Sequence, residues 1–336
     1  MKSAPRKNSS PRLRNSLRLF AALSLCAWLC APGAGYGAEY PDHPIRIIVG
    51  YGAGSPPDIV TRTVVSHFQD LLGQPVVVEN RPGASGTLAL QELTKQSADG
   101  YTIGSLASAT TAVLGLYPNS RINLAADFAP IGQVDWDYNV LVVGNSSPAK
   151  SLADLIALLK AHPGKMNFAS GGYGSPAHML GELLTHETGT SAVHVPYAEF
   201  PQAISDVITG RVDFMIMGAP AAVAQVKAGR LRALAVTSLK RLPDLADVPT
   251  FAEAGYPKVG VPAWVALIGK AGTPRPIIDR LNRAIHDALI LPDVRKGLAA
   301  LQSDAITGTP EAAGKLILGD AAMWKGVIDE AHITLQ

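Results

Sequence analysis

Two glycine-rich loops contain the residues with the clearest potential for chemistry. The first, Gly50 to Asp58, follows the apolar run Ile45 to Val49, and the second, Gly171 to His178, follows Asn167 to Ser170. In such a loop, successive backbone N–H groups point inward and the positive end of the following helix adds to them. A carboxylate or phosphate can then be held without a lysine or arginine. Each loop is therefore predicted to bind an anion.

The first loop does not fit the common nucleotide-binding patterns. Its glycines fall at positions 50, 52 and 54, and Ser55, Pro56 and Pro57 occupy the places where G-x-G-x-x-G requires its last glycine. No G-K-[ST] follows, which excludes a nucleoside triphosphate loop. A purely structural role, in which the glycines only allow tight strand-to-helix packing, remains an alternative.

The second loop makes ligand binding the favoured interpretation, because two such loops could face each other. We expect Ser170 and the amides of Gly171 and Gly172 to contact the ligand. Ser175 is well placed as a helix N-cap, which is the simpler interpretation of its hydroxyl. A third, weaker loop, Asn80 to Gly86, contains Arg81, which is more often structural beside Glu79. Two further serines complete the candidates in and after these loops, Ser85 and Ser108.

The segment His194 to Glu199 ends a predicted strand at the same sheet edge as the loops. Tyr197 and Glu199 are therefore predicted to line the ligand site, whereas His194 in mid-strand is expected to be packed in the core.

The sequence argues against catalysis and metal binding. No G-x-S-x-G occurs around the loop serines, so a nucleophile elbow is not expected. His178, Glu182 and His186 share a helix face, but residues 178 and 186 would lie about 12 Å apart along a helix that rises about 1.5 Å per residue. We expect no catalytic residue, no metal and no cofactor, with a capping His178 and a solvated His186.

The first 38 residues have the pattern of a secretory signal peptide. A basic segment with six lysines and arginines, the last of them Arg18, leads into the apolar stretch Leu17 to Leu29. Small residues lie before a predicted cleavage near Gly37/Ala38. Both cysteines, Cys26 and Cys30, would leave with it, so disulfides and thiol chemistry are excluded. The net charge would change from +2 (29 basic, 27 acidic) to −4 (23 basic, 27 acidic). We therefore predict a periplasmic protein without a nucleic-acid partner.

Short apolar runs alternate with amphipathic helical patterns along the mature chain, which predicts an α/β fold with mostly parallel sheets. The predicted strands are 45–50, 76–80, 102–106, 166–170, 192–196, 212–217 and 231–236, and the helical patterns are 58–72, 152–162, 177–188, 202–210 and 219–228. The rhythm breaks at 128–143, where two strands follow each other without a helix. It breaks again at the proline-rich segment 242–262, which is followed by the apolar run 264–269 and then by three helical patterns without new strands. These breaks predict two lobes, 39–138 with 256–336 and 139–255, with a ligand cleft between them.

Seven segments together resemble the Bug family of extracytoplasmic solute receptors, which serve tripartite tricarboxylate transporters. The resemblance covers essentially the whole mature chain, in order. The segments are Tyr40 to Arg46, Gly73 to Ala84, Asp99 to Thr102, Ala169 to Gly171, His194 to Tyr197, Leu231 to Thr237 and Val248 to Gly255.

The resemblance implies a type II periplasmic-binding-protein fold: two Rossmann-like lobes that close like a Venus flytrap on a small carboxylate. It implies ligand contacts in two loops, Tyr51, Ala53, Gly54, Ser55 and Asp58 in the first and Ser170, Gly171, Gly172 and Ser175 in the second. The chain departs from the family pattern at Gly52, Ser55 and Pro57, and Glu199 and Phe200 stand where glycine is usual. An acidic Glu199 would disfavour a second ligand carboxylate and suit an amine or hydroxyl.

The leading hypothesis is a monomeric receptor that captures a small organic anion and delivers it to membrane permease subunits. A ligand sensor for a two-component system would have the same fold and site, so the residues do not separate it from transport. An exported enzyme is a third alternative, but it would require a nucleophile, metal cluster or cofactor motif that the sequence lacks.

Overall fold

The computed structural model describes residues 1, 3–4, 40–117, 120–331 and 333. The chain divides into two compact units, Met1–Asp42 and His43–Gln336. The predicted signal peptide therefore lies almost entirely outside the described residues. Every helix and strand described below belongs to the second unit, which we call the body.

The first sheet of the body has six strands in the order β11-β4-β10-β3-β1-β2. Residues of β1 such as Ile45 and Ile47 are fully buried, because apolar side chains on a strand covered on both faces avoid water. In chain order the strands are β1 Ile45–Val49, β2 Val76–Asn80, β3 Thr102–Ala107, β4 Phe128–Asp137, β10 Ala263–Lys270 and β11 Asp304–Ala305.

The second sheet has five strands in the order β7-β6-β8-β5-β9. Its strands are β5 Asn139–Gly144, β6 Asn167–Ser170, β7 Val193–Pro196, β8 Phe214–Gly218 and β9 Leu231–Val236. The seven predicted strands are thus confirmed to within two residues at each end. Strands β4, β5 and β10 lie at the two predicted breaks in the rhythm, and the short strand β11 contradicts the expectation of no new strand among the last three helices.

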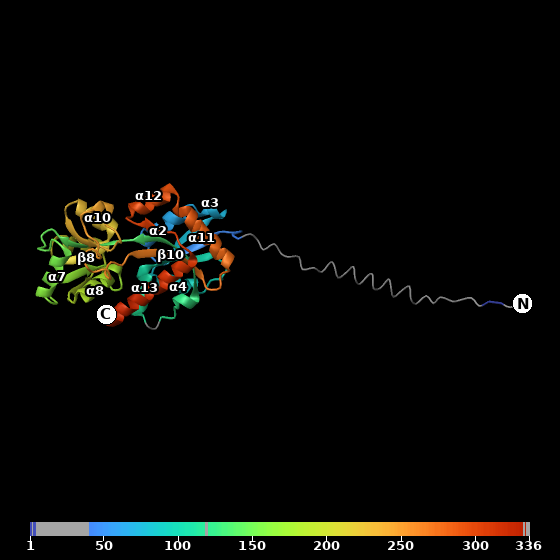
Figure 1. Cartoon of the computed structure of the whole chain (residues 1–336), viewed down its shortest axis with the longest axis horizontal. Coiled ribbons are helices and arrows are strands. Elements are labelled where there is room, and N and C mark those ends of the chain that lie inside the picture. The colour runs from blue at the N-terminus through green and yellow to red at the C-terminus, as the bar shows by residue number, and fades with distance from the viewer. Residues whose placement is uncertain (2, 5–39, 118–119, 332, 334–336) are drawn as a thin grey trace. The chain divides into compact units, whose positions relative to one another are not determined.

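Helices pack beside both sheets. In Figure 1, α7, α8 and α10 gather around β8, while α2, α3, α4, α11 and α12 lie with the strands of the first sheet. The predicted helix 58–72 is broken at Ser66 and His67 into α2 and α3. The helices are α2 Pro56–Val65, α3 Phe68–Leu72, α4 Thr87–Leu93, α5 Ser108–Leu116, α6 Leu124–Asp127, α7 Leu152–Ala161, α8 Pro176–Thr188, α9 Phe200–Ile208, α10 Ala219–Lys227, α11 Arg275–Leu289, α12 Pro292–Ala300 and α13 Pro310–Ala331, with short 3₁₀ turns η1 Ala84–Gly86 and η2 Pro243–Leu245.

The expectation of mostly parallel sheets is wrong. β1 pairs in parallel with β2 and β3, and β6 pairs in parallel with β7 and β8. In contrast, β10 is antiparallel to β3 and β4, β11 is antiparallel to β4, and β5 is antiparallel to β8 and β9. The antiparallel strands β5 and β10 are the first strands after the chain changes sheet, so no crossover helix sets their direction.

The chain moves between the sheets twice. β4 ends at Asp137 in the first sheet and β5 begins at Asn139 in the second, so only Tyr138 separates them. The return lies between β9, which ends at Val236, and β10, which begins at Ala263. The carboxyl end of β4 and the amino end of β5 therefore meet where the sheets adjoin.

Helix α13 packs against both sets of core residues. Ile317 belongs to an apolar cluster with Leu106 and Trp264 of the first sheet. Trp324 belongs to a larger cluster with Phe168 and its neighbours in the second sheet. Burial of these side chains stabilises the arrangement by removing apolar surface from water.

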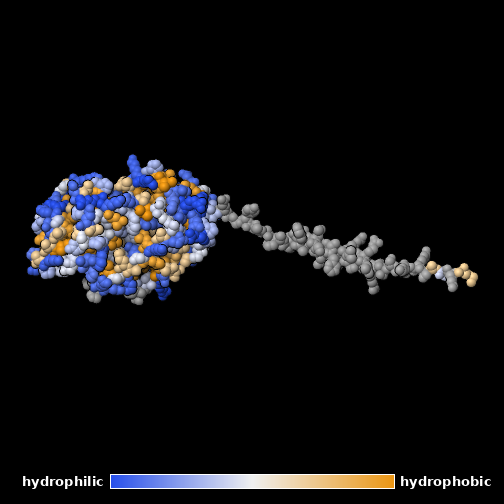
Figure 2. All heavy atoms as spheres, viewed as in Figure 1, coloured by the Kyte–Doolittle hydropathy of each residue, from blue (hydrophilic) through white to orange (hydrophobic). Residues whose placement is uncertain are grey.

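The visible face of the body in Figure 2 mixes hydrophilic and hydrophobic residues. Among the described residues, no helix is long and apolar enough to cross a membrane.

Candidate functional site

The first loop connects β1 to α2, and Asp58 holds its shape. The Asp58 side chain is buried, and its Oδ2 accepts a hydrogen bond from the amide of Gly54 at 2.9 Å. Its Oδ1 accepts from Arg62 Nε at 2.9 Å and from Asn80 Nδ2 at 2.7 Å. Burial by itself would raise the pKa of Asp58, but these hydrogen bonds outweigh it and hold the pKa below its ordinary value. Asp58 is therefore an ionised anchor of the loop, with both oxygens engaged inside the protein.

The third loop packs directly on the first. A Cβ built on Gly50 would lie 2.5 Å from the Cα of Gly86, so only glycine permits this approach. The hydroxyl of Tyr51 donates to the backbone oxygen of Ser85 at 3.0 Å and lies 3.0 Å from Thr110 Oγ1. Burial raises the pKa of Tyr51 to about 12. The third loop thus braces the first.

Several donors of the first loop have no acceptor in the described part of the chain. The Oγ of Ser55 is buried without a hydrogen-bond partner, although Ser55 precedes α2 as its N-cap residue. The two prolines that begin α2 carry no N–H. The amides of Tyr51, Gly52 and Ala53 also donate to no described residue. These groups therefore lack a hydrogen-bond partner within the described protein.

Ser170 organises the second loop, which connects β6 to α8. Its hydroxyl is fully buried and accepts from the amide of Gly172 at 3.0 Å. The same oxygen lies 3.0 Å from the carbonyl oxygen of Gly172 and 2.6 Å from Nε2 of His194. The amide of Gly174 donates to Nδ1 of His178 at 3.1 Å. The Ser170 side chain therefore faces the interior of the protein, not the exposed side of the loop.

The exposed side of the second loop presents backbone donors. The amides of Gly171 and Tyr173 have no acceptor within the portion of the chain that is described, and Gly171 is exposed. Ser175 caps α8 by accepting from the amide of His178 at 3.4 Å, as expected of an N-cap serine. Gly172 has a φ of +107°, which is readily adopted only by glycine.

Two predicted residues follow β7. The hydroxyl of Tyr197 donates to Asp206 Oδ2 of α9 at 2.8 Å, so this hydroxyl already has a protein partner. Glu199 is exposed and makes no capping hydrogen bond to α9. Phe200, the next residue, is 37% exposed and would lie 3.8 Å from a Cβ on Gly171. This end of the sheet therefore offers an acidic and an aromatic side chain beside the second loop.

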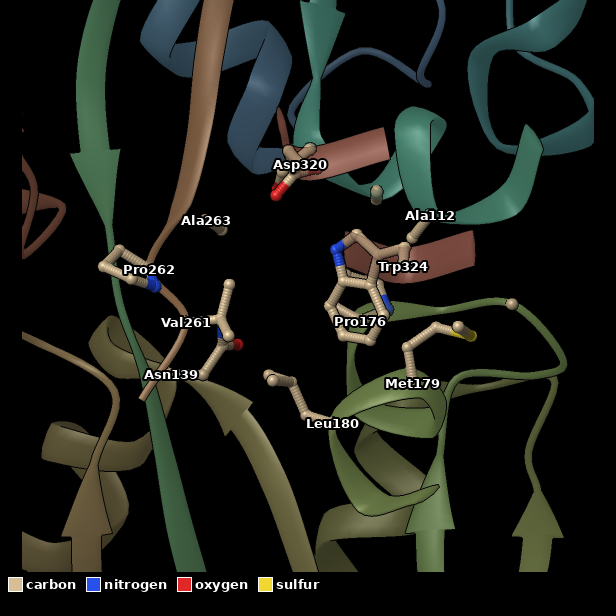
Figure 3. A pocket seen from close by; sticks show the side chains of 13 residues that line it. Ala112, Asn139, Pro176, Met179, Leu180, Val261, Pro262, Ala263, Asp320 and Trp324 are labelled. Atoms are coloured by element: carbon tan, nitrogen blue, oxygen red, sulfur yellow. The ribbon is translucent and has the colours of Figure 1, made fainter. Parts of the chain in front are cut away.

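A narrow cavity lies where elements of the two sheets adjoin (Figure 3). Ser108 and Ala263 line it from the first sheet's elements, Gly174 and Pro176 from the second loop, and Trp324 from α13. It offers about 20 Å³ to the centres of water molecules, enough for about one water. Ser108 also accepts a weak hydrogen bond from the amide of Trp264 at 3.4 Å. A ligand of several carbon atoms would require these walls to separate.

Sequence reasoning missed three carboxylates near this junction. Asp320 of α13 lines the cavity, accepts a hydrogen bond from Thr111, and has its pKa raised to about 6 by burial. Asp135 and Asp137 alternate along the end of β4, and desolvation raises the pKa of both, with repulsion from Asp137 adding to the rise at Asp135. Their i, i+2 spacing before Tyr138 was the available signal, because alternate residues of a strand share a face.

The predicted helix-face histidines have other roles. His178 in the first turn of α8 is 3% exposed, and its Nδ1 accepts the backbone N–H of Gly174 just before the helix, a contact consistent with the predicted capping role. Nε2 of His186 lies 3.4 Å from Glu330 Oε2 at the surface. Within the described ranges, no three histidine, cysteine, aspartate or glutamate side chains are grouped as metal ligands.

Comparison with known proteins identifies the family. Residues 60–333 match the tripartite tricarboxylate transporter family receptor, TctC. The chain belongs to this receptor family. It is also 36% identical over 325 residues to protein BugT of Bordetella pertussis. The aligned region covers 96% of this chain and 100% of BugT. The resemblance to Bug receptors is thereby confirmed.

Solved structures of TctC-type receptors share the fold. MatC from Rhodopseudomonas palustris, solved with bound malate, is 29% identical, with a TM-score of 0.74 over 86% of this chain and 100% of MatC. A second R. palustris protein, solved with adipate, is 30% identical, with a TM-score of 0.76 over 88% of this chain and 99% of that protein. The chain is therefore a TctC receptor with the two-lobed α/β fold of periplasmic binding proteins.

Proposed function

We propose that this TctC receptor captures one small organic carboxylate between two lobes and delivers it to the membrane permease subunits of a tripartite transporter. The proposed lobes are residues 39–138 with 256–336, which contain the first sheet, and residues 139–255, which contain the second. Each lobe contributes one glycine-rich loop to the ligand.

The observation that carries this proposal is the buried hydroxyl of Ser55, which has no hydrogen-bond partner in the described chain. A buried, unpaired hydroxyl costs about 1–3 kcal/mol, so its retention at the start of α2 favours an external partner. The free amides of Tyr51, Gly52 and Ala53 lie in the same loop. Together they form a set of donors suited to a carboxylate.

We infer that the predicted ligand residues divide into two groups. Ala53 and Gly171 present free backbone amides to the ligand and Ser55 presents an unpaired hydroxyl, whereas the amides of Gly54 and Gly172 are held by Asp58 and Ser170 and shape the loops. A second group keeps the loops in shape through contacts that the protein already makes: the side chains of Tyr51, Asp58, Ser170, Ser175 and Tyr197 and the backbone oxygen of Ser85 all have protein partners. Ser108 and Glu199 border the ligand from the cavity wall and the end of β7.

The ligand class is inferred from chemistry and from relatives. Neither loop contains a lysine or arginine, so charge neutralisation would come from amides and helix N-termini. The bound malate and adipate of the two relatives are both carboxylates. Glu199 would repel a second carboxylate placed near it, which favours a ligand with a neutral or amino group at that end.

Lobe closure would perform the capture. The donors of the two loops converge on one carboxylate only in the closed arrangement, so binding shifts the open–closed equilibrium toward closure. No bond is made or broken in this step, and the receptor is not an enzyme. We further propose that the protein is exported, is cleaved near Gly37/Ala38 and acts as a monomer in the periplasm.

Thermal unfolding of the purified protein tests the ligand class. Malate, adipate and monocarboxylates would be compared with neutral sugars and divalent metal ions at matched ionic strength. We expect at least one carboxylate to raise Tm in a concentration-dependent manner, because a ligand that binds only the folded state stabilises it. Stabilisation by sugars or metal ions alone would contradict the proposal. Native mass spectrometry of the protein isolated from the periplasm would then identify a co-purified ligand.

A further inference from the structure

The imidazole rings of His178 and His194 lie against each other beneath the second loop. The ring centroids of His178 and His194 are 4.0 Å apart, with an angle of 31° between the ring planes. The His178 side chain is 3% exposed. The Nδ1 atom of His194 is buried and has no hydrogen-bond partner among the described residues. Apolar side chains would be sufficient for core packing, so the presence of two buried imidazoles suggests an additional role.

Each imidazole holds a different part of the loop. Nδ1 of His178 accepts the hydrogen bond from the amide of Gly174 at 3.1 Å, and only an unprotonated ring nitrogen can accept. Nε2 of His194 lies 2.6 Å from the hydroxyl of Ser170, which in turn bonds the amide of Gly172. Gly172 and Gly174 both have positive φ values, +107° and +73°. The two rings thus fix both halves of a loop whose backbone is intrinsically flexible.

Burial among aromatic rings favours the neutral forms of the two imidazoles, and it outweighs the nearby Glu182 carboxyl, which would favour a charged His178. Phe168 stacks on His194 at 5.1 Å and on His178 at 6.5 Å, and Tyr173 meets both rings edge-on. The titratable groups that face the pair are Tyr173 and Glu182, whose Oε1 lies 3.7 Å from Nε2 of His178. Burial is the main cause that lowers the pKa of each histidine to about 4, and repulsion from His194 adds to the effect at His178.

We propose that the neutral imidazoles of His178 and His194 are positioning residues that hold the second loop in its binding conformation and release it when the pH falls. Protonation of His178 would convert Nδ1 from an acceptor to a donor facing the Gly174 amide, which breaks that hydrogen bond. Two adjacent imidazolium rings would also repel each other. The expected loss of ligand affinity at low pH rests on the proposed function, whereas the release of the loop does not.

The direction of the pH effect follows from linkage. In a released loop the histidines regain an ordinary pKa of about 6.5, so the released state binds more protons than the held state between about pH 6.5 and pH 4. Each histidine then favours release by up to about tenfold per pH unit in this range. Well above pH 6.5 both histidines are neutral in the held and the released state, so the pH dependence disappears.

Amide hydrogen exchange on the unliganded protein tests the release directly. Exchange in residues 168–178 would be measured from pH 7.5 to 4.5, corrected for the intrinsic pH dependence of exchange, and compared with the helix α11. We expect protection of the loop to fall as pH decreases below about 6.5 while α11 keeps its protection. Loop protection that is independent of pH, or lost equally in α11, would overturn the proposal.

Two variants and one control connect the effect to the histidines. His178→Asn keeps an acceptor for the Gly174 amide without a titrating ring, so the pH dependence of loop protection should become shallower. His186→Asn, on the same helix but paired with Glu330 at the surface, should retain the wild-type profile. If His178→Asn does not fold, His194→Gln offers the same test. An unchanged pH profile in a folded His178 or His194 variant contradicts the proposal.

Binding of malate and adipate over the same pH range forms the second arm. For whichever probe binds at pH 7.5, we expect the ratio of wild-type Kd to His178→Asn Kd to rise as the pH falls, because protonation of the probe affects both proteins equally. A constant ratio would overturn the link between loop release and binding. If neither probe binds at pH 7.5, the proposed ligand class fails for these two acids, and the exchange measurement still decides whether the imidazoles hold the loop.

Discussion

Ser55 and Ser175 occupy equivalent positions before α2 and α8, but only Ser175 caps its helix. The hydroxyl of Ser175 accepts from the amide of His178, whereas the hydroxyl of Ser55 is buried without a partner. Both helices begin with proline, so the sequence context is similar. The difference assigns a structural role to Ser175 and leaves Ser55, whose hydroxyl we propose to meet the ligand, without a described protein partner.

Alanine substitution of the two serines should therefore separate stability from binding. We expect Ser55→Ala to leave the free energy of unfolding unchanged or to raise it, because an unpaired buried hydroxyl is removed, while carboxylate affinity falls at least several-fold. Ser175→Ala, the matched control, should lower stability by about 1 kcal/mol through loss of a cap. Urea unfolding and calorimetric titration measure the two quantities. A loss of stability in Ser55→Ala without a loss of affinity would contradict this assignment.

Gly54 should be intolerant of branched side chains because of its backbone conformation. Its φ is +79°, and a Cβ at this position would meet no atom within 4 Å, so strain rather than collision opposes substitution. We expect Gly54→Val to cost about 1–2 kcal/mol and to distort the amides of the first loop, which lowers affinity. Gly319→Ala in α13, where the φ is ordinary and the space is open, should increase stability slightly and leave binding intact. Equal effects of the two substitutions on binding would be inconsistent with a loop-specific role.

Tyr51→Phe should loosen the contact between the first and third loops. The variant loses the hydrogen bonds of the hydroxyl to Ser85 and Thr110, at a cost of about 1 kcal/mol. Affinity should fall as well, because the first loop loses its brace. Tyr117→Phe, at a side chain that is 42% exposed, should change neither quantity. Chemical unfolding and titration with a bound carboxylate provide the comparison, and unchanged affinity in Tyr51→Phe would show that the brace does not matter for binding.

Asp137 should make the protein less stable as the pH rises. Desolvation raises the pKa of this carboxyl in the folded state, so the folded protein binds more protons than the unfolded chain at mildly acidic pH. Its contribution to stability is therefore full below the unfolded pKa of about 3.9 and is lost as the pH rises through the folded value.

The variant Asp137→Asn checks this sign. We expect it to increase stability at pH 8 by about 1–3 kcal/mol, because an uncompensated charge is removed and repulsion of Asp135 is relieved. At pH 4 the gain should be much smaller, since the carboxyl is then protonated in the folded wild type. Tm values measured from pH 4 to 8 would refute the assignment if the gain were greatest in acid.

The amino-acid sequence by itself determined the elements and the family. Runs such as Val76 to Asn80 and Leu231 to Val236 were predicted with their observed bounds, because local apolar patterning and flanking turns specify a strand. The glycines and prolines of both loops were also readable, since they constrain the backbone locally.

The tertiary structure decided which polar groups already have partners. Asp58 and Ser170 resembled ligand residues in sequence, yet their oxygens bond Gly54 and Gly172 within their own loops, together with Asn80 and His194 from elsewhere in the chain. Strand direction at β5 and β10 likewise depended on where the chain crosses between sheets. Such features arise from contacts between residues distant in the chain, which local patterning does not encode. Whether a hydroxyl or amide is free for a ligand is therefore a property of the folded protein.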